Sequence, residues 1–331
     1  MSTADVRGRI LRGDALQLLQ HLPASSVDCV LTSPPYFRLR DYGTPGQLGS
    51  ERSVVAWVDT LGQVAQELHR VLTPTGTLWL NLGDSYATHR REGAPHKSLL
   101  LGPERLALAL IEGGWVLRNK IVWSKPSVIP TSAADRLRCS WEVVYLFAKQ
   151  RHYFFDLDSI REPHESRAPP QAHPRVDDSA RGPNAAGTSG LAALKKAGLP
   201  GHPLGKNPGD VWRLSTSAYR GDHPAMFPTS LAARVIQAGC PERRCTRCRA
   251  PHRRAVLRAL GGSATRGALT PTCDCNGASE PGVVLDPFIG SGTTALAAEQ
   301  LGRDWFGVEL NADYARSAEA RIQQARRARP A

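Results

Sequence analysis

The stretch Gly282-Val-Val-Leu-Asp-Pro-Phe-Ile-Gly-Ser-Gly-Thr-Thr294 decides the fold class of this chain. Its apolar first half is typical of a short buried strand, and its second half is typical of a glycine-rich turn that leads into a helix. Gly290 and Gly292 allow positive φ angles and let a ligand approach the backbone closely. The helix that follows offers free N–H groups at its amino end. This order of strand, turn and helix predicts a ligand site in an α/β fold.

Two acidic residues end neighbouring predicted strands around this turn. Asp286 ends the strand over 282–286, and Glu309 ends the strand over 305–309, 23 residues later. An acid at about this distance reaches a ribose hydroxyl in dinucleotide-type sites. The turn lacks the Gly-Lys-Ser/Thr of NTP-binding loops, and an acid at the strand end disfavours a pyrophosphate. A ligand with an amino group and a sulfonium suits the site, and a tight turn without any ligand is the alternative.

Alternating strands and helices extend along the chain on both sides of this turn. Short apolar runs predict strands, apolar residues at helical spacing predict helices, and Thr73-Pro-Thr-Gly76 is predicted to end the first long helix. The pattern predicts an α/β fold with a Rossmann-like, mostly parallel sheet and helices on both faces. The predicted strands are 27–32, 77–81, 115–123, 141–148, 211–213, 282–286 and 305–309, and the predicted helices are 53–72, 103–112, 229–238, 293–301 and 312–327.

Length and charge restrict the class of protein. A chain of 331 residues suggests one large domain with insertions or two ordinary domains. Its 41% hydrophobic and 22% charged residues are typical of a soluble globular protein. No run approaches the roughly 20 apolar residues of a membrane span, which excludes an integral membrane protein. The formal net charge of +12 favours a polyanionic partner such as nucleic acid.

A second motif, Thr32-Ser-Pro-Pro-Tyr36, follows the strand predicted over 27–32. Two prolines fix the backbone and remove two N–H donors, so the carbonyl groups of Ser33 and Pro34 stay available as acceptors. The Ser33 hydroxyl is a further acceptor, and Tyr36 offers a flat ring. These groups suit a planar base that donates from an exocyclic amino group and stacks on the tyrosine. A rigid turn with a buried tyrosine is the alternative.

The two motifs together resemble those of the amino-group DNA methyltransferases that depend on S-adenosylmethionine. Ser33-Pro-Pro-Tyr36 comes first and Asp286-Pro-Phe-Ile-Gly-Ser-Gly-Thr-Thr294 comes near the C-terminus, which is the permuted order of the β class. The resemblance covers residues 8–160 and 211–325. It implies a permuted class I methyltransferase fold, DNA as the partner, and a role in DNA methylation and restriction–modification. Relatives of this class are often dimers, so a homodimer is one expected assembly.

The resemblance also implies which residues carry the chemistry. Glu309 is expected on the ribose hydroxyls of the cofactor, and Asp286 near its methionine amino group. The expected catalytic residues are Ser33, Pro34, Pro35 and Tyr36. The expected cofactor-binding residues are Asp14, Ala15, Thr32, His223, Phe227, Pro228, Asp286, Pro287, Phe288, Gly290, Ser291, Gly292, Thr293, Glu309 and Leu310.

Further segments match the same family. Gly13-Asp14-Ala15-Leu16 resembles its opening segment, whose aspartate helps to hold the cofactor. His223-Pro-Ala-Met-Phe-Pro228 resembles the segment that packs around the methionine part of the cofactor. Trp123-Ser-Lys125 and Trp141-Glu142 resemble the strand segments that line the base pocket.

The serine in the first motif bears on the methylated base. In this family Ser-Pro-Pro-Tyr is most associated with cytosine N4, and Asp- or Asn-Pro-Pro-Tyr with adenine N6. The resemblance therefore implies site-specific N4-cytosine methylation of double-stranded DNA, with N6-adenine as the alternative. We expect the base to be flipped out of the duplex and its amino nitrogen to attack the sulfonium methyl directly. Methylation of RNA or a small molecule stays open, as does a zinc-stabilised DNA-binding protein with an inactive core.

Five of the seven cysteines fall within residues 240–275. Cys245-Thr-Arg-Cys248 and Cys273-Asp-Cys275 form two close pairs, and such pairs are typical of a tetrahedral zinc held by four thiolates. Cys240 and His252 are spare candidate ligands. We predict a zinc module over these residues with Cys245, Cys248, Cys273 and Cys275 as ligands, and reduced thiols without metal are the alternative.

The distribution of cysteines also bears on the compartment. A secreted protein spreads cysteine pairs along the chain, whereas a cluster in one segment is typical of a metal site in a cytosolic protein. Cys29 and Cys139 lie apart in the sequence and are predicted to be buried thiols. The amino terminus has no apolar signal region. We therefore expect a cytoplasmic, nucleoid-associated protein of bacterial or phage type.

Two segments do not fit the alternating pattern. Residues 243–258 hold seven arginines and no acid, so they are either a solvated face or a grip for DNA phosphates. Residues 161–210 are rich in proline and glycine and are predicted to be a flexible loop that contributes to target recognition. The predicted catalytic core then comprises residues 1–160, 211–239 and 276–331.

Overall fold

The computed structural model describes residues 3–127, 130–164, 202–215, 227–258 and 264–328. Two compact units are distinguished within the chain. The first comprises Met1–Asp156, Gly209–Arg253 and Thr270–Ala331, and the second comprises Leu157–Pro208 and Arg254–Leu269. Most of the predicted loop over 161–210 lies outside the described residues.

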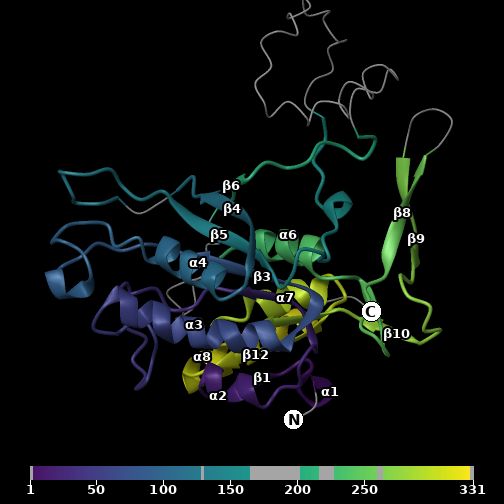
Figure 1. Cartoon of the computed structure of the whole chain (residues 1–331), viewed down its shortest axis with the longest axis horizontal. Helices are drawn as coiled ribbons and strands as arrows, with labels where there is room; N and C mark the ends of the chain where they lie inside the picture. The colour runs from purple at the N-terminus through teal and green to yellow at the C-terminus, as the bar shows by residue number, and fades with distance from the viewer. Residues whose placement is uncertain (1–2, 128–129, 165–201, 216–226, 259–263, 329–331) are drawn as a thin grey trace, which may run out of the picture. The chain divides into compact units, whose positions relative to one another are not determined.

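The first unit is built on an eight-stranded sheet with the order β1-β12-β11-β2-β3-β5-β4-β6 (Figure 1). Only β5 runs against its neighbours, so the predicted mostly parallel sheet is confirmed. The strands are β1 (Ile10–Arg12), β2 (Val27–Thr32), β3 (Leu72–Leu82), β4 (Val116–Ser124), β5 (Trp141–Ala148), β6 (Val211–Arg213), β11 (Val283–Asp286) and β12 (Asp304–Glu309).

Helices cover both faces of this sheet, as the side-chain alternation along β3 illustrates. Leu78, Leu80 and Leu82 belong to the hydrophobic core that includes α3. Trp79 points the other way, where its ring leaves no room for a side chain at Gly239 of α6. The helices are α1 (Thr3–Val6), α2 (Ala15–Gln20), α3 (Val54–Val71), α4 (Gly102–Glu112), α6 (Thr229–Gly239), α7 (Thr293–Gln300) and α8 (Ala312–Arg327).

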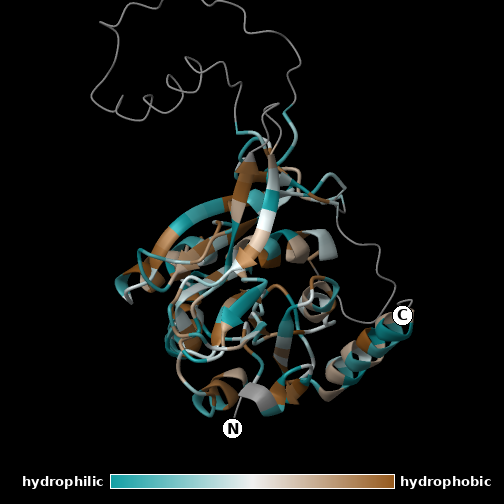
Figure 2. Cartoon of the chain, turned by 90° about the vertical axis from the view of Figure 1, so that its right-hand side faces the viewer, coloured by the Kyte–Doolittle hydropathy of each residue, from teal (hydrophilic) through white to brown (hydrophobic). Residues whose placement is uncertain are grey.

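Helix α3 shows why the local sequence predicts its element so well. Ser53 caps the helix by accepting a hydrogen bond from the backbone N–H of Ala56 at 3.2 Å. The apolar residues of α3 fall on one buried side. Helix α8 is likewise two-sided, with polar and apolar colours alternating along it (Figure 2), and its small and apolar residues Ala315, Ala318 and Ile322 are buried. Among the described helices, none combines the length and apolar character needed to cross a membrane.

The structure corrects two local predictions. Helix α3 ends before Thr73-Pro-Thr-Gly76 as predicted, but this segment belongs to β3, which begins at Leu72 and not at residue 77, because Leu72 pairs with Val27 across a bulge. Cys139 is exposed rather than buried, since it lies in the segment between β4 and β5, where Leu137 is also exposed. The thiol of Cys29 is buried in β2, as predicted.

Four short strands and two short helices complete the described elements. β7 (Arg243–Cys245) pairs with β10 (Ser279–Pro281) in the first unit. β8 (Arg253–Arg258) pairs with β9 (Ala264–Thr270) as a separate ribbon (Figure 1). The single-turn helices are η1 (Arg90–Glu92) and η2 (Leu157–Ser159).

Arg244 on β7 overturns the expectation that the arginine-rich run is a solvated or DNA-gripping face throughout. Its side chain is 0% exposed and lies 2.7 Å from the carboxylate of Asp28 on β2. It also donates to the carbonyl oxygen of Ser26 and to the carboxylate of Glu280, both at 3.0 Å. A buried guanidinium needs such partners because its desolvation is costly. The charge therefore serves the fold and not a ligand.

We predict that Arg244→Met destabilises the protein by about 3–5 kcal/mol, because it leaves the carboxylate of Asp28 buried without its cation. Chemical denaturation followed by circular dichroism measures this change. Arg316→Met is the matched control, because its partner Asp313 and its own side chain are exposed and such pairs contribute little. Equal stability of the two variants would contradict the assigned role of Arg244.

Candidate active site

Polar residues collect where the parallel strands of the first unit end. β1, β12, β11 and β2 are successive parallel neighbours, so their carboxyl ends share one edge of the sheet. Asp14 follows β1, Glu309 ends β12, Asp286 ends β11 and Thr32 ends β2. Ligands of open α/β sheets bind outside this edge, so it is the candidate site.

Asp286 joins the two motifs that the sequence singles out. One carboxylate oxygen accepts from the hydroxyl of Thr32 at 2.7 Å and from the backbone N–H of Phe288 at 3.1 Å. The other accepts from the hydroxyl of Thr294 at 2.6 Å. Burial raises the pKa of Asp286 from 3.8 to about 6, although the three donors act in the opposite direction. The carboxylate therefore ties the end of β2 to the glycine turn.

The glycine turn is held from two sides. Gly290 and Gly292 have φ angles of 49° and 78°, which favour glycine. Glu309 accepts from the backbone N–H of Gly290 at 3.0 Å and from that of Asn311 at 2.8 Å. Burial raises the pKa of Glu309, and these N–H donors oppose the rise. The carboxylate of Glu309, which is predicted to face a ribose, is thus held at the turn by the N–H groups of Gly290 and Asn311.

Arg321 holds the other side of this turn, and the sequence prediction missed it. From α8 it donates to the carbonyl oxygen of Ser291 at 2.8 Å and to the hydroxyl of Thr293 at 3.1 Å. The only sequence signal was an arginine in a terminal helix. The partner lies 30 residues away, and helix periodicity alone does not indicate it.

The remaining expected cofactor residues lie in several places. Asp14 caps α2 by accepting from the N–H of Gln17 at 2.9 Å. Phe227 and Pro228 are buried at the start of α6, whose C-cap Cys240 contacts Gly282, just before the amino end of β11. That direction puts the start of α6 at the carboxyl edge. Ala15, Ser291 and Thr293 are buried, Pro287 and Phe288 lie in the turn, Leu310 follows β12, and His223 lies outside the described residues.

The Ser-Pro-Pro-Tyr turn ends in a chain of hydrogen bonds. The hydroxyl of Ser33 donates to the hydroxyl of Tyr36 at 3.0 Å, and the latter donates to the carboxylate of Glu142 at 2.8 Å. Lys125 pairs with the other carboxylate oxygen of Glu142. Burial, and then the charge of Glu142, raise the pKa of Tyr36 well above its ordinary value, so its phenol stays protonated.

Packing fixes the turn in place. Pro34 is buried, and the carbonyl oxygen of Pro35 accepts from the indole N–H of Trp57 at 2.9 Å. A Cβ atom at Gly83 would lie 2.8 Å from the ring of Tyr36, so this ring needs a glycine beside it. The proline and tyrosine side chains therefore occupy defined positions beside β3.

Asn81 is a second residue that the sequence prediction missed. It is 1% exposed on β3, and its amide donates to Glu142 at 2.7 Å and also reaches the hydroxyl of Tyr36. Its own carbonyl oxygen is buried without a hydrogen-bond partner among the described residues. An unsatisfied buried acceptor costs about 1–3 kcal/mol. A polar residue within an apolar predicted strand was the available signal.

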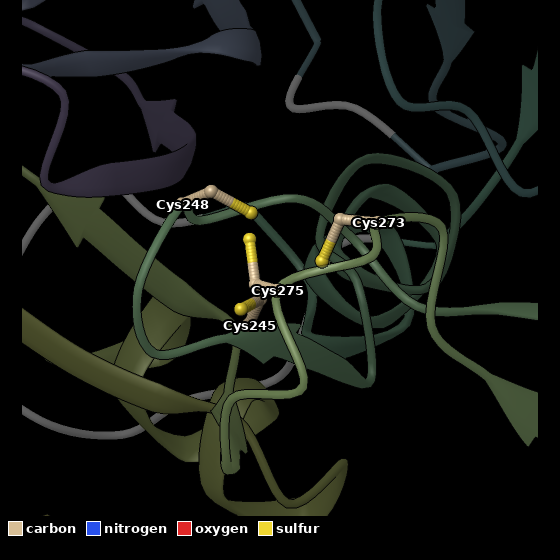
Figure 3. Close-up of side chains that lie close together, drawn as sticks. All are labelled: Cys245, Cys248, Cys273 and Cys275. Carbon is tan, nitrogen blue, oxygen red and sulfur yellow. The ribbon is translucent and has the colours of Figure 1, made fainter.

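The four cysteines predicted as metal ligands also come together in the first unit. The sulfur atoms of Cys245, Cys248, Cys273 and Cys275 all lie within 4.8 Å of one another (Figure 3). Cys240 is not in this group, because its buried thiol lies at the end of α6 near the carbonyl of Pro241. His252 is outside the group as well.

Comparison with known proteins gives a consistent result. The family model described as DNA methylase, N6_N4_Mtase, matches residues 27–320. The chain is 32% identical to the type II methyltransferase M.SmaI of Serratia marcescens, with 96% of this chain and 91% of that protein covered. It is 32% identical to M.Cfr9I of Citrobacter freundii, with 95% and 87% covered. The solved PvuII DNA methyltransferase (cytosine-N4-specific) shares the fold at a TM-score of 0.58 and 20% identity, with 96% and 90% covered.

The raised pKa of Asp286 makes stability depend on pH. The folded value of about 6 exceeds the ordinary 3.8, so the folded protein binds this proton more tightly than the unfolded chain. The contribution of Asp286 to stability therefore falls as pH rises from about 4 to about 6, by about 3 kcal/mol in all. Asp286→Asn removes this term, which urea denaturation at several pH values measures. Parallel pH profiles for the variant and the wild type would contradict it.

Proposed function

This chain belongs to the DNA methylase family matched over residues 27–320, and we propose that it methylates the exocyclic N4 of cytosine in double-stranded DNA. The observation that carries the proposal is the turn that begins with Ser33, whose hydroxyl contacts Tyr36. This serine form of the motif is the one most associated with cytosine N4 in the family. Named relatives are type II methyltransferases, which supports DNA as the substrate.

The carboxyl edge of the sheet fits S-adenosylmethionine, which supplies an electrophilic methyl group when it is bound. The acids Asp286 and Glu309 flank the glycine turn and Asp14 follows β1 at the same edge, and a ligand that carries a sulfonium and an amino group matches their charge. Each carboxylate oxygen has about two acceptor sites. Glu309 therefore keeps acceptor capacity for ribose hydroxyls beyond its bonds to Gly290 and Asn311.

The catalytic turn positions the amino group of the base. The hydroxyl of Ser33 donates its own proton to Tyr36 and its oxygen accepts from the amide of Asn81 at 3.4 Å, which leaves one of its two acceptor sites for the base. An amino group that donates to Ser33 and to the carbonyl of Pro34 presents its nitrogen lone pair to the methyl group. Positioning of this kind supplies much of the rate in direct transfer reactions. The buried thiol of Cys29 takes no part, because burial raises its pKa to about 12.

The attacking nitrogen must lose one proton once its bond to the methyl group has formed. The hydrogen bonds from Ser33 through Tyr36 to Glu142 provide a path for this proton. Ser33 takes the proton from nitrogen as its own passes to the Tyr36 oxygen, and the tyrosine proton passes to Glu142. Asn81 and Lys125 hold this carboxylate in place. The network therefore ends in an anionic acceptor.

Adenine N6 is the second candidate, because adenine presents a similar amino group and the family model covers both activities. Incubation with labelled S-adenosylmethionine and unmethylated genomic DNA, followed by nucleoside analysis, separates the two. We expect N4-methylcytosine. N6-methyladenine would replace the proposal with the alternative, and absence of label in any nucleic acid would remove both.

We predict that Glu142→Gln lowers kcat by about 10²–10⁴-fold, because the amide is a poor acceptor for the transferred proton. Tyr36→Phe should lower it similarly, since it interrupts the same chain while keeping the ring. Single-turnover methylation measures the rate, and calorimetry shows whether cofactor affinity is retained. Glu104→Gln is the control, because this residue pairs with Lys120 on the surface. Full activity of Glu142→Gln would exclude the proton route.

A further inference from the structure

The four clustered cysteines come from two short loops that no part of the proposed reaction uses. Cys245 ends β7 and Cys248 follows it in the next turn, while Cys273 and Cys275 lie between β9 and β10. In tetrahedral zinc sites the sulfur atoms lie about 3.8 Å apart, given Zn–S bonds of about 2.3 Å. Four sulfur atoms within 4.8 Å of one another already approach this arrangement (Figure 3).

Both loops share two backbone features. The N–H groups of Arg247 and Cys248 hydrogen-bond to the sulfur of Cys245, and the N–H of Cys275 bonds to the sulfur of Cys273. The residue after each pair has a positive φ, 65° at Arg249 and 49° at Asn276. Non-glycine residues rarely adopt this conformation. In both loops backbone N–H groups point at cysteine sulfur atoms. Such donors stabilise the negative charge of metal-bound thiolates.

Charge supports the same reading. A zinc ion with four thiolates has a net charge of −2, and the neighbouring residues supply cations. Arg247 donates to the carbonyl oxygen of Cys275, and Arg249, directly after Cys248, also pairs with Glu280. A site with four sulfur ligands has no open position for substrate, so its role is structural.

The cluster is coupled to the core through Arg244, which directly precedes Cys245. β7 pairs with β10, with Cys245 opposite Ser279. The carboxylate of Asp28 that binds Arg244 also accepts from the backbone N–H of Val283 at 2.8 Å. Asp28 and Val283 lie at the amino ends of β2 and β11, the strands whose other ends hold the two motifs.

We propose that Cys245, Cys248, Cys273 and Cys275 bind one structural Zn²⁺. This ion, which we call a clamp, holds β7 and β10 together, and their pairing keeps Arg244 in contact with Asp28 at the amino ends of β2 and β11. The site lies at the edge of the sheet opposite to the catalytic turn. It stabilises the strand pair that carries the chemistry, and it contacts neither cofactor nor base. Metal binding at such a site contributes directly to folding.

Elemental analysis of the purified full chain tests the ligand set. We expect one zinc per chain in the wild type and in the control Cys139→Ser, whose thiol is exposed and outside the cluster. Zinc should be lost in Cys248→Ser and Cys273→Ser, neither of which is fully buried. Absence of bound zinc in the wild type, or disulfides within the cluster by mass spectrometry, would overturn the site. Methylation activity does not enter this result.

Hydrogen exchange before and after chelation tests the clamp. Removal of zinc should speed exchange at the N–H of Val283, because its acceptor Asp28 loses the seated Arg244. Exchange at the N–H of Gly290, which donates to Glu309 at the other edge, should change much less. If exchange at Val283 is unchanged after verified loss of zinc, the metal does not stabilise the contact between Arg244 and Asp28. That result would overturn the proposed clamp.

Discussion

The carboxylate of Asp286 is the contact on which the arrangement of this site depends. It accepts from Thr32 and Thr294, which belong to two motifs separated by more than 250 residues. Burial of a carboxylate is costly, and three donors offset that cost. The turn proposed to hold the base and the turn proposed to hold the cofactor are consequently fixed to each other. A direct transfer reaction needs this, because its rate depends on the relative position of the two reactants.

The parallel sheet separates two tasks along its strands. The two sequence motifs follow the carboxyl ends of β2 and β11, and the amino ends are joined by Asp28 and its buried partner Arg244. An ion pair of this kind stabilises little compared with apolar packing, but its loss is expensive. Packing of α3 and α6 on the two faces keeps the ends in register. Chemistry at one edge therefore relies on polar contacts at the other.

Ser33, Tyr36, Asn81 and Glu142 form one hydrogen-bonded network, to which we assign both positioning and proton transfer. Its members come from β2, β3 and β5, so the reversed strand is needed to bring the carboxylate to the turn. The unsatisfied oxygen of Asn81 is a cost that packing alone does not explain.

The local sequence was sufficient for the strand–turn–helix motif, the mostly parallel sheet, the α3 helix and the close pairs of cysteines. These features depend on side-chain periodicity, on glycine and proline geometry and on near neighbours. Only the tertiary structure decided that Arg244 is buried, that Cys139 is exposed, that Arg321 holds the turn and that Asn81 joins the network of Ser33, Tyr36 and Glu142. Each of these outcomes is set by residues that folding brings near from distant positions, and periodicity carries no information about such partners.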